Sequence, residues 1–186
     1  MDDFWRPDLP AEFTCAHPLE HQLYSKIRPR RTEAIRFDAP DAQAEADRFA
    51  ARLAAAEPVY VLYQGVGTSG HLAFNEPGAT GFCTSVRAEV ARLCETSKQQ
   101  LANDPNFRGL GYVPDQGIPL TIPAMLQARF VFTMVPLALK RPIMERLFAT
   151  EAPTPQLPAS ILREHEGMLF LDRDSCPEQR RTSAAQ

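Results

Sequence analysis

The chain has 186 residues, of which 44% are apolar and 23% are charged, and its formal net charge is −3 at pH 7. This length allows one globular domain with a buried core, and so small a charge argues against a nucleic-acid partner. No apolar run approaches the length of a membrane span, and the first residues lack the basic-then-apolar order of a signal peptide. We therefore expect a cytoplasmic protein without membrane or nucleic-acid partners.

Helix and strand patterns alternate along the chain. Residues 1–16 contain several prolines and are expected to be irregular, and the polar stretch 175–186 is expected to form a tail. The periodicity predicts helices over 19–27, 38–57, 91–102 and 141–149, and strands over 33–37, 58–64, 86–90, 118–122, 129–135 and 168–171. Such alternation indicates an α/β fold with a mainly parallel sheet.

The four cysteines show no C-x-x-C spacing and are expected to be reduced thiols. Cys15, His17 and His21 lie close together in the sequence and could be imagined as a metal cluster. Three potential ligands without a fourth are weak evidence for a metal, so we expect surface residues there instead. The sequence therefore predicts no metal site.

The most informative segment is residues 65–78, which reads Gly-Val-Gly-Thr-Ser-Gly-His-Leu-Ala-Phe-Asn-Glu-Pro-Gly and follows an apolar stretch. Glycines let the backbone approach a ligand closely. His71 and Glu76 on the same loop form a plausible acid–base pair. Since ligands of α/β proteins usually bind where strands end, this segment is the candidate active-site loop.

Gly65, Gly67 and Gly70 also spell G-x-G-x-x-G, which is typical of dinucleotide binding. That fingerprint requires a helix to begin at once, with its N-terminus facing the pyrophosphate. Here residues 74–78 read Phe-Asn-Glu-Pro-Gly, and proline with glycine does not continue a helix. A dinucleotide site is therefore disfavoured.

Residues 70–77, Gly-His-Leu-Ala-Phe-Asn-Glu-Pro, resemble the Gly-His-Ile-Ala-Phe-Asn-Glu-Pro motif of the glucosamine-6-phosphate deaminase/isomerase family. The related 6-phosphogluconolactonases share only the Gly-His part. Residues 1–4, Met-Asp-Asp-Phe, are similar to the family's Met-Asp-Glu-Tyr segment, and Lys140 falls where the deaminases place a phosphate-binding lysine. The resemblance extends from Met1 to about Asp174.

The resemblance implies a three-layer, Rossmann-like α/β domain over 1–174, with a mainly parallel sheet flanked by helices, followed by the tail 175–186. Family members begin with strands and helices before the Met-Asp segment, and one of their loops cradles the sugar phosphate. The domain is therefore expected to be truncated at its N-terminus. The apolar face or sheet edge that this would expose predicts association, for instance as a homo-oligomer.

The resemblance also implies a reaction, the conversion of glucosamine 6-phosphate to fructose 6-phosphate and ammonia through ring opening and proton transfer between C2 and C1. This chemistry needs no redox cofactor and no metal. His71 would open the ring, because histidine can give and take a proton near neutral pH. Glu76 would orient His71 and support its charged form, and Asp2 would remove the C2 proton.

The partner implied is a phosphorylated amino sugar. Lys140 would bind its phosphate as a point charge, and the remaining contacts would come from Gly65, Gly67, Gly70 and Asn75. Ser69 stands where the family usually has an acidic residue or asparagine, and a serine carries no charge to tune His71. We group Ser69 with the catalytic positions Asp2, His71 and Glu76.

Two alternatives stay open. The chain could be a non-catalytic relative that binds a sugar phosphate weakly, which Ser69 and the missing phosphate loop favour. A 6-phosphogluconolactonase is a weaker alternative, because residues 73–77 match the deaminases.

Overall fold

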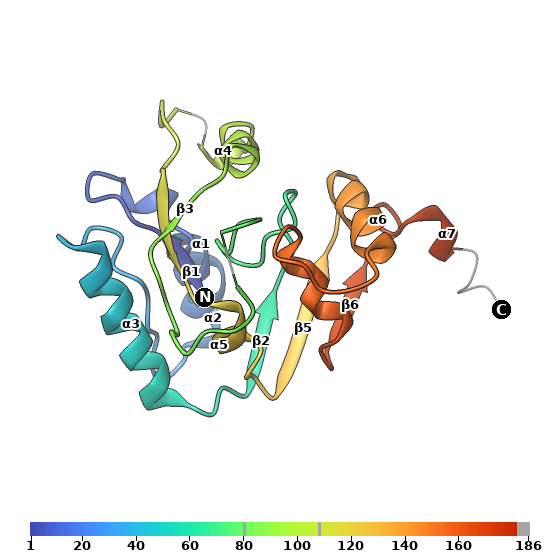
Figure 1. Ribbon diagram of the computed structural model, residues 1–186. Helices are drawn as coiled ribbons and strands as arrows, with labels where there is room; N and C mark the ends of the chain where they lie inside the picture. The colour runs from blue at the N-terminus through green and yellow to red at the C-terminus, as the bar shows by residue number, and fades with distance from the viewer. Residues whose placement is uncertain (80, 108, 182–186) are drawn as a thin grey trace.

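The computed structural model describes residues 1–79, 81–107 and 109–181, and it contains a parallel sheet with helices around it (Figure 1). The sheet has the order β2-β5-β6, built from β2 (Val61–Gln64), β5 (Phe130–Val135) and β6 (Met168–Leu171). Both pairings in it are parallel, with Leu62 opposite Val131 and Thr133 opposite Leu169. The prediction of an α/β fold with a parallel sheet flanked by helices is confirmed.

A second sheet is antiparallel and has the order β1-β4-β3. It consists of β1 (Asp2–Phe4), β4 (Gln116–Pro119) and β3 (Ala91–Arg92). The expectation that residues 1–16 are irregular is thus wrong for Asp2–Phe4, because Asp2 pairs with Pro119 and Phe4 with Gly117. The partner strand lies more than a hundred residues away, so no local pattern reveals this pairing.

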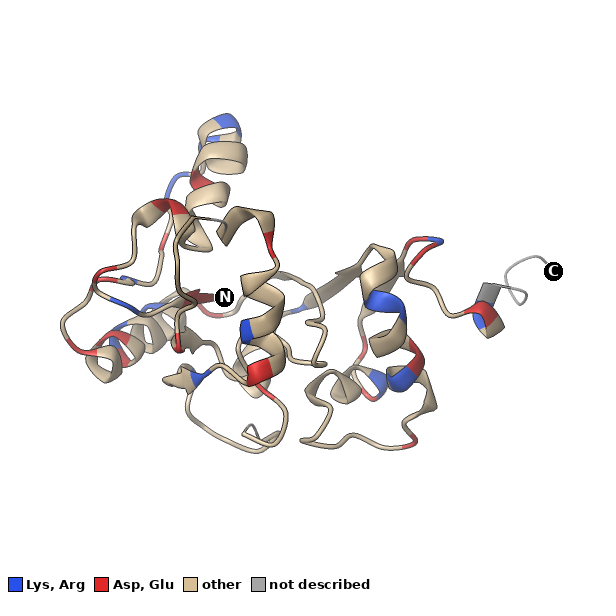
Figure 2. Cartoon of the chain, turned by 90° about the horizontal axis from the view of Figure 1, so that it is seen from above, with Lys and Arg blue, Asp and Glu red and all other residues tan. Residues whose placement is uncertain are grey.

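The helices vary in length, and the two longest lie toward opposite ends of the molecule in both views (Figures 1 and 2). The α-helices are α1 (Ala16–Leu19), α2 (Ser25–Ile27), α3 (Ala42–Ala56), α4 (Glu95–Ala102), α5 (Ile122–Met125), α6 (Arg141–Ala149) and α7 (Glu178–Arg181). A π-helix, η2 (Glu20–Tyr24), joins α1 to α2, and 3-10 turns occur at η1 (Ala11–Phe13), η3 (Pro105–Phe107), η4 (Ala138–Lys140) and η5 (Pro158–Arg163). None of the helices in the described residues is long and apolar enough to cross a bilayer.

Helix α3 begins later than its apolar pattern suggests, because Asp41 is its N-cap. The Asp41 side chain accepts a hydrogen bond of 2.8 Å from the Ala44 amide. That bond satisfies one of the amides left free in the first turn. The predicted helices over 19–27 and 141–149 and the strand over 168–171 are also confirmed.

Three predicted elements differ in the structure. Residues 33–37 form no strand, since the Arg36 amide donates to the buried Glu45 side chain at 2.7 Å instead of to a neighbouring strand. The stretch 86–90 contains only the isolated bridge between Ala88 and Leu120, and the strand lies at β3, where a helix was predicted. Ile122, predicted as the last residue of the strand over 118–122, is instead the first residue of α5. Within the tail, residues 178–181 form α7 and 182–186 lie outside the described part.

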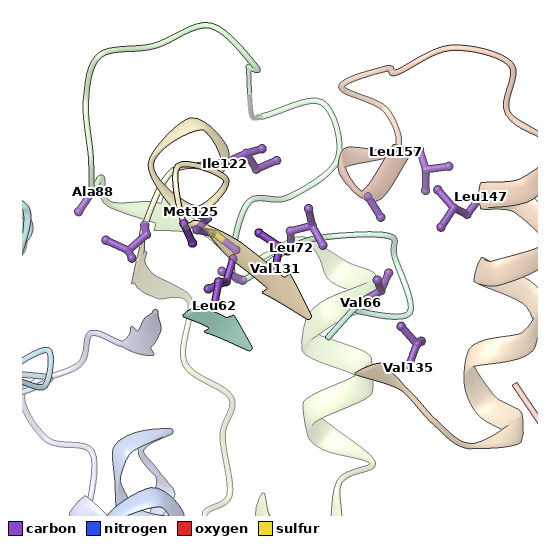
Figure 3. Close-up of a cluster of buried hydrophobic side chains, with 14 of the residues drawn as sticks. Leu62, Val66, Leu72, Ala88, Ile122, Met125, Val131, Val135, Leu147 and Leu157 are labelled. Carbon is purple, nitrogen blue, oxygen red and sulfur yellow. The ribbon is translucent and has the colours of Figure 1, made fainter. Parts of the chain in front are cut away.

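The main hydrophobic core joins the parallel sheet to the candidate active-site loop (Figure 3). Leu62 and Val131 from neighbouring strands face Leu72 from the loop, and Leu72 has no exposed surface. A smaller cluster contains Phe4 and Phe74, whose ring centroids are 5.0 Å apart. Both clusters therefore contain residues of the loop, so its position depends on the folding of the whole domain.

One face of the parallel sheet carries exposed apolar side chains. We call it the aromatic face, and it consists of Tyr63, Phe132, Met134, Met168 and Phe170, which share one side of the sheet by strand register. Tyr63 stacks on Phe132 with centroids 5.3 Å apart, yet Tyr63 is 65% exposed and Phe170 is 50% exposed. Apolar surface gathered in this way is typical of a surface that associates.

A Phe170→Lys variant is expected to self-associate less than the unmodified chain, because a charge cannot be buried unpaired in an apolar contact. Sedimentation velocity over a range of protein concentrations measures the effect. Ala44→Lys on exposed α3 adds the same charge away from the aromatic face and should leave the distribution unchanged. Equal behaviour of both variants would contradict association through this face.

Candidate active site

The loop that follows β2 places His71 by means of two glycines. The Gly67 amide donates to the His71 carbonyl at 3.0 Å, and the Gly70 amide donates to the Gly67 carbonyl at 2.9 Å, which closes a tight turn. A Cβ at Gly67 would overlap Nε2 of the His71 ring, and a Cβ at Gly70, where φ is +92°, would overlap Leu157. Both positions therefore require glycine.

The His71 ring lies in a cluster of hydrogen-bonding groups. Its Nδ1 is 2.9 Å from Oγ of Ser69, 3.0 Å from Oγ of Ser97 and 3.4 Å from Oε2 of Glu76. The His71 side chain is 14% exposed and that of Glu76 is 2% exposed. The structure thus brings together His71, Glu76 and Ser69, as the sequence predicts.

The Glu76 carboxylate is buried among donors. It accepts from Oγ of Ser69 at 3.3 Å and from Sγ and the amide of Cys94 at 3.2 and 3.4 Å. Burial alone would raise the pKa of Glu76, but the hydrogen bond and charge of His71, with the Ser97 and Cys94 donors, outweigh it and lower the pKa below its usual value. Glu76 is therefore ionised at neutral pH.

Asp2 lies close enough to His71 for their charges to interact. It is partly buried on β1, and the Met1 carbonyl beside it accepts from the Leu120 amide at 2.8 Å. Burial raises the pKa of Asp2, while the positive N-terminus and His71 act in the opposite direction. A raised pKa suits a carboxylate that has to accept a proton.

Neighbouring Asp3 has a different environment, because successive side chains of a strand point to opposite faces. It is 2% exposed and accepts from the amides of Cys15 at 2.8 Å and Ala16 at 3.0 Å. Asp3 thus anchors the start of α1 to β1, which is a structural role.

Lys140 reaches the same loop from η4. Its Nζ donates to the Val66 carbonyl at 2.8 Å, directly before Gly67 in the sequence. Burial lowers the pKa of Lys140. The turn that carries Lys140 begins at Leu137, which has a φ of +83°. The Leu137 amide donates a hydrogen bond of 2.9 Å to the Asp172 carboxylate, which holds this turn in place.

Asn75 is buried and faces the protein interior. Its Nδ2 donates to the carbonyls of Leu72 and Leu120 at 2.8 Å each, so it ties the loop to the segment after β4. It is 1% exposed, which fits an anchoring role better than direct contact with a ligand. Gly65 lies at the end of β2, where a Cβ would be 3.4 Å from the Met134 carbonyl.

Ser97 and Cys94 of the α4 region join the cluster although no sequence motif contains them. Cys94 is the N-cap residue of α4 and Ser97 lies in its first turn. Their participation depends on the packing of α4 against the loop, which the sequence pattern does not reveal.

His17 and His21 stack with centroids 4.2 Å apart and line a cavity of about 500 Å³ beside Phe4 and Phe107. Within residues 1–79, 81–107 and 109–181, no group of three or more His, Cys, Asp and Glu side chains could hold a metal ion. Asp2, His71 and Glu76 are not among the residues that line this cavity.

The comparisons with known proteins converge on one fold. A solved structure of a monomeric glucosamine-6-phosphate deaminase superposes with a TM-score of 0.82 at 24% identity, over 94% of this chain and 71% of that one. A 6-phosphogluconolactonase from Trypanosoma brucei superposes with a TM-score of 0.67 at 20% identity, over 94% and 70%. The chain therefore has the α/β fold that these two solved structures share.

Sequence similarity is more specific. No protein-family model matches the sequence. The glucosamine-6-phosphate deaminase of Geobacillus sp. (strain WCH70) is 31% identical over 145 residues, which are 76% of this chain and 55% of the relative. That of Shouchella clausii is 30% identical over 167 residues, 88% of this chain and 65% of the relative. The chain belongs to the glucosamine-6-phosphate deaminase family and spans 55–65% of the length of these two relatives.

Proposed function

We propose that this chain carries the catalytic centre of an amino-sugar phosphate deaminase, which converts glucosamine 6-phosphate and water to fructose 6-phosphate and ammonia. The observation that carries the proposal is the pair of half-buried His71 and buried Glu76, 3.4 Å apart on a glycine loop at the end of β2. The curated relatives are named for this activity. We also propose that residues 1–174 form a single domain and that the protein is cytoplasmic, as expected from the sequence.

His71 opens the sugar ring in this proposal. The ring oxygen must gain a proton while the C1 hydroxyl loses one, and a histidine can serve both steps near neutral pH. Glu76 is ionised and sits on the Nδ1 side of the ring, so it stabilises the charged imidazole while Nε2 meets the substrate. Ser69 bridges the two side chains.

Asp2 then moves the proton between C2 and C1. It belongs to a strand of the antiparallel sheet, while His71 follows a strand of the parallel sheet, so the substrate would bind where the two sheets meet. Loss of the C2 proton gives an enolamine, whose protonation at C1 gives an imine that water hydrolyses to the ketone and ammonia. Each proton that leaves the substrate at C2 returns at C1, so no cofactor is needed.

The test is an assay of the purified chain with glucosamine 6-phosphate, in which fructose 6-phosphate and ammonia are both measured. His71→Ala should abolish product formation, while His21→Ala, which removes an exposed histidine, should not. Hydrolysis of 6-phosphogluconolactone without ammonia release would instead indicate the lactonase. Binding of the sugar phosphate without turnover would indicate a non-catalytic relative.

Lys140→Ala is expected to raise the KM for glucosamine 6-phosphate about 10–100-fold, because one charge-assisted hydrogen bond to the phosphate contributes about 1.5–3 kcal/mol. The turnover number should change less, since the phosphate lies far from the reacting carbons. Lys98→Ala removes a surface lysine that pairs with Glu95 and Asp115 and serves as the control. An unchanged KM in Lys140→Ala would exclude a role for Lys140 in phosphate binding.

A further inference from the structure

Helix α4 places a hydroxyl group, which the loop motif does not contain, next to His71. Oγ of Ser97 lies 3.0 Å from Nδ1 of His71, almost the same distance as Oγ of Ser69 at 2.9 Å. Ser97 is 2% exposed, so water does not compete for this contact. The same nitrogen is therefore approached by one hydroxyl from the loop and one from α4.

The positions of the protons follow from what the neighbours can donate. The Glu76 carboxylate accepts only, and the single hydroxyl proton of Ser69 is directed to its Oε2. Oε2 of Glu76, which can only accept, also lies 3.4 Å from Nδ1 of His71. With its proton directed to Glu76, the Ser69 hydroxyl presents a lone pair to His71. Nδ1 must then carry a proton, because the Ser69 lone pair and the carboxylate would otherwise both face an unprotonated nitrogen.

The opposite nitrogen is in a different environment. Nε2 lies against Gly67, at the place that a Cβ of any other residue would occupy. With the proton on Nδ1, Nε2 is the ring nitrogen that keeps its lone pair in the neutral histidine.

We infer that Ser97 is a positioning residue, which together with Ser69 holds neutral His71 with its proton on Nδ1 and leaves Nε2 as the basic nitrogen. The inference rests on the proposed function in one respect, namely that Nε2 exchanges a proton with the sugar. Ser97 itself touches no substrate. It acts through His71. The packing of α4 therefore helps to determine which nitrogen of the His71 ring carries the proton.

Nitrogen-15 NMR of the histidine ring nitrogens tests the inference without any substrate. In the unmodified chain at a pH where His71 is neutral, Nδ1 should show the shift of a protonated nitrogen and Nε2 that of an unprotonated one. His71→Ala identifies the signals. Ser97→Ala should move both shifts toward a mixture of the two tautomers, and a double variant with Ser69→Ala should move them further. Thr96→Ala removes an exposed hydroxyl from the same helix and should move neither.

Kinetics supply the second readout. Ser97→Ala should lower kcat about tenfold with little change in KM, and Ser97→Thr, which keeps the hydroxyl, should recover most of that loss. Thermal unfolding of each variant identifies any that fail to fold. The nitrogen-15 shifts of Ser97→Ala then show whether Ser97 controls the tautomer of His71. An unprotonated Nδ1 in the unmodified chain, or shifts unaffected by Ser97→Ala, would overturn the inference. If the expected shifts are found in a chain without deaminase activity, the tautomer assignment stands and the proposed function fails.

Discussion

An Asp2→Asn variant is expected to lose about 10²–10⁴-fold in kcat, the usual contribution of a positioned general base. The amide cannot accept the C2 proton at neutral pH. Because burial raises the pKa of Asp2, the acid limb of the kcat/KM profile of the unmodified enzyme should lie above the ordinary aspartate value of 3.8. Steady-state kinetics from acidic to neutral pH measure both effects.

Asp3→Asn is the matched control, since it makes the same change one residue along β1. In this variant the side-chain NH₂ group would face the backbone N–H donors of Cys15 and Ala16, which bond to the Asp3 carboxylate in the unmodified chain. We expect a loss of about 1–3 kcal/mol in the free energy of unfolding, the range for a buried group left without its partner. Asp2→Asn should instead keep its stability, because folding no longer buries a charge there. Equal loss of activity in both variants at full folding would contradict the assignment of the base.

Glu76→Gln is expected to reduce both activity and stability. The glutamine amide would place a donor among the donors His71, Ser69 and Cys94, and the charged imidazole would lose its counter-ion. The expected cost is about 1–3 kcal/mol of unfolding free energy, together with a loss in kcat of at least about 10²-fold. Urea unfolding and the deaminase assay measure the two effects.

The stability effect of Glu76→Gln should depend on pH in a defined direction. The pKa of Glu76 is lower in the folded chain than its ordinary value of 4.5, so the unfolded state binds more protons as the pH falls. Its contribution to stability is therefore full above about pH 4.5 and disappears as the pH falls through the folded value. Glu95→Gln, on the exposed side of α4, should show no comparable difference. A pH-independent cost in Glu76→Gln would contradict an ionised, hydrogen-bonded carboxylate.

The fold could be predicted where the pattern is local. Strand β6 and helix α6 have the predicted bounds, because β6 is a continuous apolar run and the apolar residues of α6 recur at helical spacing. Strand β1 could not be predicted, because three residues acquire their strand conformation only by pairing with β4 far along the chain. The predicted strand at 33–37 fails for the converse reason, since the Arg36 amide donates to the Glu45 side chain and not to a neighbouring strand.

The site residues likewise divide into those that a local motif predicts and those that it does not. His71, Glu76 and Ser69 lie within eight residues of one another, so a loop motif was sufficient to place them together. Lys140 and Asp2 were assigned by resemblance, and the structure adds that Lys140 contacts the Val66 carbonyl. Ser97 and Cys94 were missed, because one turn of a short polar helix carries no signal for what it packs against.

The small number of carboxylates around His71 has a consequence for the charge balance of the site. Among the side chains that contact Nδ1, Glu76 carries a negative charge and Ser69 and Ser97 are neutral. When the ring takes up a proton, the cluster passes from a net charge of −1 to electroneutrality. Protonated His71 and Glu76 thus form a compensated ion pair, whereas neutral His71 leaves the Glu76 anion uncompensated within this cluster.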